Sequence, residues 1–276
     1  MSEALARLTD EAPCLEVSYD TRGRQTVVRG LGEQHLKIVL DQLSTRWNLE
    51  LDTATPAIPY RETISATAEA RYRHKKQSGG AGQFGEVALR VEALARGSGL
   101  QLADEVKGGA IPTHFMPAVE KGVRQALAEG AIAGYPIQDL RVVVTDGKHH
   151  AVDSNEVSFV TAARHALIEA VTAARPQVLE PILDLTIKVA DPHFGEVSAE
   201  LAVRRGRVTS TDSPSSGWTL ISAKVPMASM EGFETRLKAI CAGESEFVVD
   251  AGGYEAAPAE TQARLIQAHG THGATQ

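Results

Sequence analysis

The sequence predicts an α+β fold in three consecutive parts, residues 1–55, 56–176 and 177–260. Three observations predict it. The last part has the order strand, helix, strand, strand, helix, strand, which is that of a ferredoxin-like domain. The first part has the same order without its opening strand. Between them lies a glycine-rich turn, flanked by strands that are predicted from the alternation of apolar and polar residues.

The first part is expected to be an incomplete ferredoxin-like domain. Its helix, two strands, second helix and closing strand are predicted at residues 2–11, 14–20, 25–29, 32–47 and 48–52. The second helix carries an apolar stripe at helical spacing, formed by Leu36, Leu40, Leu43 and Trp47. Two prolines within residues 55–59 then indicate a linker.

The middle part is organised around residues 74–85, a turn with glycines at positions 79, 80, 82 and 85. The basic stretch Arg71–Lys76 leads into the turn, and an alternating, strand-like segment follows it. Glycine lets the backbone adopt positive φ and lets another backbone approach closely. Because positive charge attracts phosphates, the pattern favours a tip that contacts nucleic acid. An inert hairpin turn is the alternative.

A nucleotide site at the same glycines is a weaker interpretation. Gly80-x-Gly82-x-x-Gly85 matches the glycine spacing of dinucleotide and kinase loops. A dinucleotide site needs an apolar strand before the glycines and a helix after them, whereas here a basic segment precedes and a strand follows. The other kinase motifs and a Gly-Lys-Ser/Thr phosphate loop do not occur in the sequence.

Strands near residues 100–106 and 137–145, with two helices, complete the middle part. Asp153-x-x-Glu156 resembles a capping box, so Asp153 either caps a helix or has a functional role. His149 and His150 beside Asp153 could bind a metal, but no second cluster at ligand spacing supports a metal site.

Composition narrows the class of protein. Apolar residues make up 43% of the chain and charged residues 23%, which is typical of a soluble globular protein. Two cysteines fit a reducing compartment, and no apolar run predicts a signal peptide or a membrane span, so we expect a cytoplasmic protein. The net charge of −7 argues against nonspecific nucleic-acid binding by the whole surface. Residues 56–176, with 14 basic and 13 acidic side chains, are the part most compatible with a polyanion.

The last part is predicted as a complete ferredoxin-like domain. Its strands are expected at residues 183–189, 207–211, 219–225 and 246–250, with helices at 194–205 and around Met230–Ile240. A weak helix is expected after Pro258, and residues 261–276 are expected to be a disordered tail.

The segment His74–Gly85 resembles the domain IV hairpin of the translation elongation factor G family. Further segments resemble the family in the same order along the chain: Gly30–Leu36, Tyr60–Ile64, Lys107–Pro112, Ala133–Pro136, Val152–Ser154, Leu179–Ile182 and Arg204–Gly206. The resemblance covers about residues 3–260. It implies ferredoxin-like domains III and V around a domain IV that resembles the second domain of ribosomal protein S5.

The resemblance also implies a partner, since the family's domain IV tip enters the decoding centre beside mRNA and tRNA. Gln77, Ser78 and Gly79 would form one tip loop, and His149 to Asp153 the other. Side chains of these types can hydrogen-bond to sugars and base edges. The residues expected to bind nucleic acid are Lys75, Lys76, Gln77, Ser78, Gly79, Gly80, His149, His150, Asp153, Arg204 and Arg205. We expect no catalytic residue and no metal ligand.

The sequence also departs from the family pattern. The GTPase domain, domain II and the first strand of domain III are missing, Ala151 replaces an aspartate, and Glu244 replaces an arginine. We therefore expect a ribosome-binding carboxyl-terminal arm that promotes tRNA–mRNA translocation, without enzymatic activity or a cofactor of its own. GTP and Mg²⁺ belong to complete family members. The alternatives are a fragment of a complete translational GTPase, an arm that works with a separate GTPase half, and a ribosome-recycling or ribosomal-protection relative.

Overall fold

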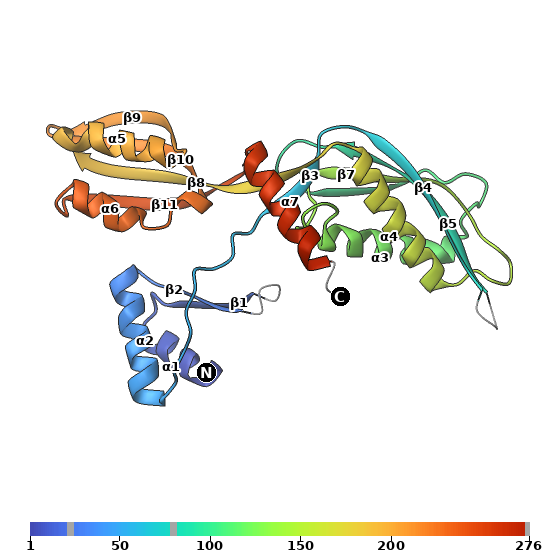
Figure 1. Ribbon diagram of the computed structural model, residues 1–276, viewed down its shortest axis with the longest axis horizontal. Helices are drawn as coiled ribbons and strands as arrows, with labels where there is room; N and C mark the ends of the chain where they lie inside the picture. Colours follow the sequence, from blue (N-terminus) through green and yellow to red (C-terminus); the bar gives the residue numbers. More distant parts are fainter. Residues whose placement is uncertain (21–24, 78–81, 274–276) are drawn as a thin grey trace. The chain divides into compact units, whose positions relative to one another are not determined.

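A computed structural model describes residues 1–20, 25–77 and 82–273 (Figure 1). Contacts between residues divide the chain into two units, Met1–Ile58 and Pro59–Gln276. The first unit has one hydrophobic core, and the second unit has two.

The first unit contains α1 (Ser2–Glu11), β1 (Glu16–Asp20), β2 (Gln25–Arg29) and α2 (Glu33–Trp47). The two strands form an antiparallel pair, with Val17 opposite Val28. Both valines pack on the core that α1 and α2 supply, whose buried members are Ala4, Leu5, Leu8, Leu15, Val39 and Leu43. The helices and strands agree with the sequence pattern. Of the predicted stripe of α2, Leu36, Leu43 and Trp47 belong to this core, whereas Val39 takes the place expected for Leu40.

The predicted closing strand at residues 48–52 is wrong, because these residues form no strand. Asn48 adopts a left-handed conformation with φ of 52° and ends α2, and the backbone N–H of Leu49 bonds to Leu43 O. In a complete ferredoxin-like sheet the last strand pairs with the first strand alone. The described part of this unit has no such first strand, so residues 48–52 have no backbone to pair with.

The second unit contains a four-stranded sheet in the order β4-β5-β7-β6. Its strands are β4 (Ala68–Lys76), β5 (Gln83–Ala93), β6 (Leu100–Asp104) and β7 (Leu140–Lys148). All pairs are antiparallel except β6 with β7. The helices α3 (Met116–Glu129) and α4 (Glu156–Ala173) bury one face, with Val87, Leu89 and Phe159 fully enclosed.

The other sheet of this unit confirms the ferredoxin-like order. Strands β8 (Pro176–Ala190), β9 (Arg207–Ser215), β10 (Trp218–Pro226) and β11 (Ser245–Ala256) pair in the order β11-β8-β10-β9. Helices α5 (Phe194–Val203) and α6 (Phe233–Ile240) complete the domain. The first strand of the unit, β3 (Arg61–Ile64), pairs with the start of β8, so β8 joins the two halves through backbone hydrogen bonds.

A buried carboxylate fixes the loop that follows α3. Glu62, on β3, is fully buried and accepts hydrogen bonds from four backbone N–H groups. Its Oε2 accepts from residues 131 and 132 at 2.7 and 3.0 Å, and its Oε1 from residues 133 and 135 at 2.8 and 3.0 Å. One side chain thus replaces the secondary-structure partners that this loop lacks.

The expectation of a disordered tail is wrong for residues 261–273, because α7 occupies Ala259–Gly273 (Figure 1). Residues 274–276, the rest of that expected tail, lie outside the described residues. The side chain of Gln262 accepts the N–H of Val178 at 3.0 Å and donates to Ala257 O at 2.7 Å. A Cβ on Gly134 would lie 2.6 Å from His269 Nδ1, so the helix also rests against the loop after α3. These tertiary contacts stabilise a helix whose own periodicity is weak.

Candidate nucleic-acid interface

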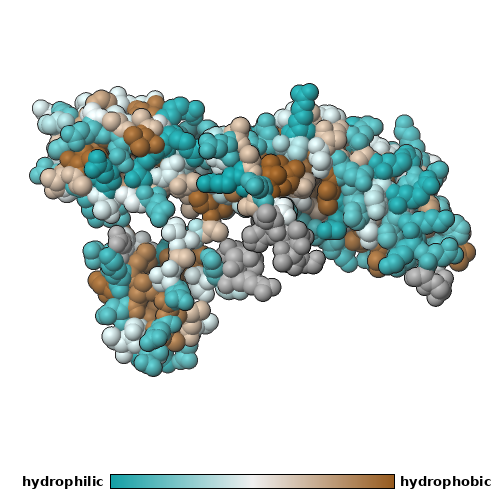
Figure 2. Space-filling view, in the orientation of Figure 1, coloured by the Kyte–Doolittle hydropathy of each residue, from teal (hydrophilic) through white to brown (hydrophobic). Residues whose placement is uncertain are grey.

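The hairpin β4–β5 and the loop between β7 and α4 meet at one end of the sheet. The backbone N–H of Gly82 donates to Asp153 Oδ1 at 3.2 Å, and the N–H of Phe84 donates to Asp153 O at 2.8 Å. Ser154 Oγ donates to Phe84 O at 2.9 Å. Three hydrogen bonds therefore join segments about seventy residues apart into one surface, which we call the tip. The visible surface around this end of the second unit is mostly hydrophilic (Figure 2).

Asp153 is a tip residue and not a helix cap, so of the two alternatives for this residue the capping box is wrong. Helix α4 begins at Glu156, and Asn155 is its N-cap, accepting the N–H of Ser158 at 2.9 Å. Asp153 lies two residues too early to reach that position. The close approach also explains the glycine at 82, since a Cβ there would lie 2.8 Å from the Asp153 carboxyl carbon.

The two tip histidines have different partners. His150 Nδ1 accepts the backbone N–H groups of Val152 and Asp153 at 3.3 and 3.2 Å, so a neutral ring carries its proton on Nε2. A protonated ring would instead pair with Asp153 Oδ2, 3.3 Å from Nδ1. The side chain is 54% exposed, so it can offer a donor to a partner. His149 Nδ1 lies 3.3 Å from Ala110 O and links the tip to the loop before α3.

The basic end of the hairpin lies beside these histidines. Lys75 and Lys76 end β4, and Gln77 follows them; all three are exposed. Neither lysine forms an ion pair with any residue that the structure describes. His74 Nε2 lies 3.0 Å from Gln83 Oε1, and this contact links β4 to β5 next to the turn. The predicted residues Ser78, Gly79 and Gly80 lie outside the described residues.

Arg204 and Arg205 do not lie at the tip. Arg204 follows α5, donates to Glu200, Ser229 O and Glu231 O at 2.6 to 2.7 Å, and is only 16% exposed. Arg205 pairs with both oxygens of Glu180, at 2.9 and 2.8 Å. Both guanidinium groups thus hold the last domain together, and this geometry gives no support to their predicted role in nucleic-acid binding.

Sequence reasoning missed a second group of charges near the tip. Arg71 and Arg73 converge on Glu86, and Arg71 also pairs with Asp146. The hydrogen bond from Arg71 lowers the pKa of Asp146. The sequence feature that could have revealed this group is the alternation of Arg71, Arg73 and Lys75, which predicts that the three side chains share one face of a strand.

The glycine turn is not a dinucleotide site, because β5 and not a helix follows it. Among the residues that the structure describes, no three His, Cys, Asp or Glu side chains come together to hold a metal ion. The described helices include none that is long and apolar enough to span a membrane.

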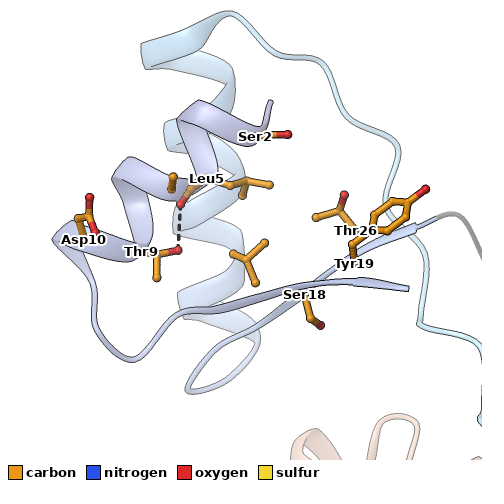
Figure 3. A pocket seen from close by; sticks show the side chains of 9 residues that line it. Ser2, Leu5, Thr9, Asp10, Ser18, Tyr19 and Thr26 are labelled. Atoms are coloured by element: carbon orange, nitrogen blue, oxygen red, sulfur yellow. Dashed lines mark hydrogen bonds between the residues drawn. The ribbon is translucent and has the colours of Figure 1, made fainter. Parts of the chain in front are cut away.

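A groove of about 560 Å³ lies between α1 and the β1–β2 hairpin of the first unit (Figure 3). Leu5, Thr9 and Asp10 line it from the helix, and Tyr19 and Thr26 line it from the strands. Thr9 donates its hydroxyl to Leu5 O at 2.9 Å, so this polar group is already satisfied within α1. The groove does not gather the converging charged groups of a ligand site.

Comparison with known proteins defines the class of protein to which this chain belongs. Three sequence models match consecutively: elongation factor G domain III at residues 1–55, domain IV at 56–175, and the elongation factor G carboxyl terminus at 177–265. None of the matching models is a GTPase domain. The chain belongs to the elongation factor G family and corresponds to the carboxyl-terminal part of such a translation factor.

Individual relatives agree with this family assignment. The chain is 39% identical over 267 residues to an elongation factor G-like protein of Thermotoga maritima, covering 97% of this chain and 39% of the relative. It is 38% identical over 270 residues to elongation factor G of Dehalococcoides mccartyi, covering 98% and 39%. A crystal structure from Thermus thermophilus is similar with a TM-score of 0.87 at 30% identity, covering 98% of this chain and 40% of that one. The chain thus spans about two fifths of the length of these relatives.

Proposed function

We propose that this chain is a ribosome-binding arm whose tip enters the decoding centre and promotes movement of tRNA and mRNA. The observation that carries the proposal is the joining of the two tip loops by Asp153, which bonds to Gly82 and Phe84. This arrangement gathers cations and hydrogen-bonding side chains at one exposed end of a folded domain. Such an end suits a partner that is itself a folded RNA, with unpaired bases and accessible sugars.

The proposed work of the tip is binding and positioning. Lys75 and Lys76 would pair with phosphates, each contact contributing about −0.7 to the log–log salt slope on a single strand. Gln77 and the Nε2 of His150 would hydrogen-bond to sugar or base atoms, each worth about 1 kcal/mol. Asp153 would orient the loops from within and would not itself contact RNA.

The partners that follow are ribosomal RNA, tRNA and mRNA, in the cytoplasm. GTP and Mg²⁺ would act through a GTPase domain and not through residues of this chain. The matched relatives are more than twice as long, which favours an arm that works with GTPase domains, either in one longer polypeptide or as a separate half. A recycling or protection role is the other alternative, distinguished by which ribosomal state the arm engages.

The test joins this chain to the GTPase and second domains of a relative and measures single-turnover translocation. A Gln77→Ala/His150→Ala variant should slow translocation and leave the melting temperature nearly unchanged. His150 loses its bonds to two exposed loop N–H groups, but Asp153 and Ser154 still join the two loops. A matched Gln101→Ala/His114→Ala control changes the same residue types at exposed positions elsewhere in the domain. Equal rates in the two variants, or a lower melting temperature in the first, would mean that the tip loops are only structural turns.

A further inference from the structure

The basic residues Arg71, Arg73 and Lys75 share one face of β4. Successive strand residues point to opposite faces, and the intervening Tyr72 stacks on His165 of α4, on the helix-covered face. The three basic side chains therefore lie on the face that α3 and α4 leave open. Register places Arg73 opposite Glu86, and Glu86 opposite Lys148 of β7, so Lys148 belongs to the same face.

One buried carboxylate orients the two arginines. The Glu86 side chain is 2% exposed and binds Nη1 of Arg71 at 2.7 Å and Nε of Arg73. Burial alone would raise the pKa of Glu86, but the hydrogen bonds from Arg71 and Arg73 outweigh it and lower the pKa, so the group stays ionised. Arg73 uses only Nε in this contact and keeps its terminal N–H groups for a partner, at 57% exposure.

Charge on this face changes along the strands. Near the tip, four cations (Arg71, Arg73, Lys75 and Lys148) face two carboxylates (Glu86 and Asp146), a net of +2. Farther from the tip, two cations (Arg90 and Arg141) lie among three carboxylates (Glu69, Glu92 and Glu105), a net of −1. In the described residues, Lys75 and Lys148 form no ion pair. The face therefore attracts a polyanion at its tip end only.

We infer that the tip end of this open sheet face, formed by Arg71, Arg73, Lys75 and Lys148, binds the sugar–phosphate backbone of an RNA strand. Basic residues two apart on a β-strand are separated by about 6.6 Å. This spacing is close to the separation of successive phosphates along an RNA strand. Phe84, opposite Lys75 in register and 6.2 Å from the His150 ring, adds an aromatic surface where the strand would leave the tip. The inference rests on the proposed function in taking RNA as the partner, and it adds a track for the backbone beyond the tip loops.

The experiment measures binding of the full chain to a short fluorescein-labelled single-stranded RNA by anisotropy, across a salt series. The variant Lys75→Gln/Lys148→Gln removes two cations without breaking an ion pair. The control, Lys121→Gln/Arg124→Gln, removes the same amount of charge from α3, which covers the opposite face, and also breaks exposed ion pairs with Glu156 and Glu120. We expect the face variant to lose about 1.4 from the salt slope and to bind at least about tenfold more weakly near 50 mM salt, and the control to keep the parent slope.

Two further arms make the result specific. Arg73→Gln should weaken binding, while Arg73→Lys should restore part of it, each at a measured melting temperature. An unchanged slope in the face variant, an equal loss in the control, or tighter binding to an anionic vesicle or an acidic peptide overturns the inference. The tip variant Gln77→Ala/His150→Ala separates the two proposals. If it alone impairs ribosome engagement, the proposed function stands and the sheet-face track fails.

Discussion

Replacing Glu62 with glutamine should destabilise the second unit by an amount that the contacts allow us to calculate. Each carboxylate oxygen accepts two backbone N–H groups. A glutamine keeps one acceptor oxygen and turns an NH₂ group toward the other two N–H groups. Two charge-assisted hydrogen bonds are lost, each worth about 1.5–3 kcal/mol, so the free energy of unfolding should fall by about 3–6 kcal/mol.

The assay is thermal and urea denaturation followed by far-ultraviolet circular dichroism. A loss of this size corresponds to roughly 6–24 °C in melting temperature for a unit of this length. Glu69→Gln is the control, because the Glu69 side chain is 68% exposed and its one ion pair among the described residues, with Arg90, is long at 3.9 Å. The control should change stability by less than about 0.5 kcal/mol. If Glu62→Gln also changes the free energy of unfolding by less than about 0.5 kcal/mol, the four-donor arrangement does not stabilise the loop.

Four other outcomes are expected. Amides of residues 1–58 should exchange faster than those of β8–β11, because β1 and β2 pair only with each other among the described residues; equal protection in a proven monomer would contradict this. Glu86 has a lowered folded-state pKa, so its contribution to stability is present above its unfolded pKa of about 4.3 and is lost as the pH falls through the folded value. Glu86→Gln should therefore flatten the acid limb of a melting-temperature profile, and an unchanged limb would refute the coupling. Gln262→Ala leaves the N–H of Val178 without its partner, so α7 amides should exchange faster, and unchanged exchange would show that α7 does not depend on this contact. A labelled GTP analogue titrated into the pure chain should not bind, since the sequence has no Gly-Lys-Ser/Thr loop; saturable micromolar binding would refute this.

The sequence by itself determined the local structure and the family. Apolar residues at helical spacing marked α2, and alternation marked β5, because these patterns record which side of an element is buried. The order βαββαβ and the segments around His74–Gly85 indicated the ferredoxin-like domain and the elongation factor G family, which the structure and the comparisons confirm. Such signals lie within a few residues of one another, so they can be recognised without a fold.

The tertiary structure alone decided which distant groups meet. Residues 48–52 alternate like a strand but form none, since a strand needs a partner backbone. Asp153 lies near a helix start, yet it bonds to Gly82, about seventy residues away in sequence. Glu86 looks like an ordinary solvent-facing strand residue, but Arg71 and Arg73 enclose it. Hydrogen bonds and ion pairs of this kind depend on chain packing over long sequence separations, which local periodicity does not record.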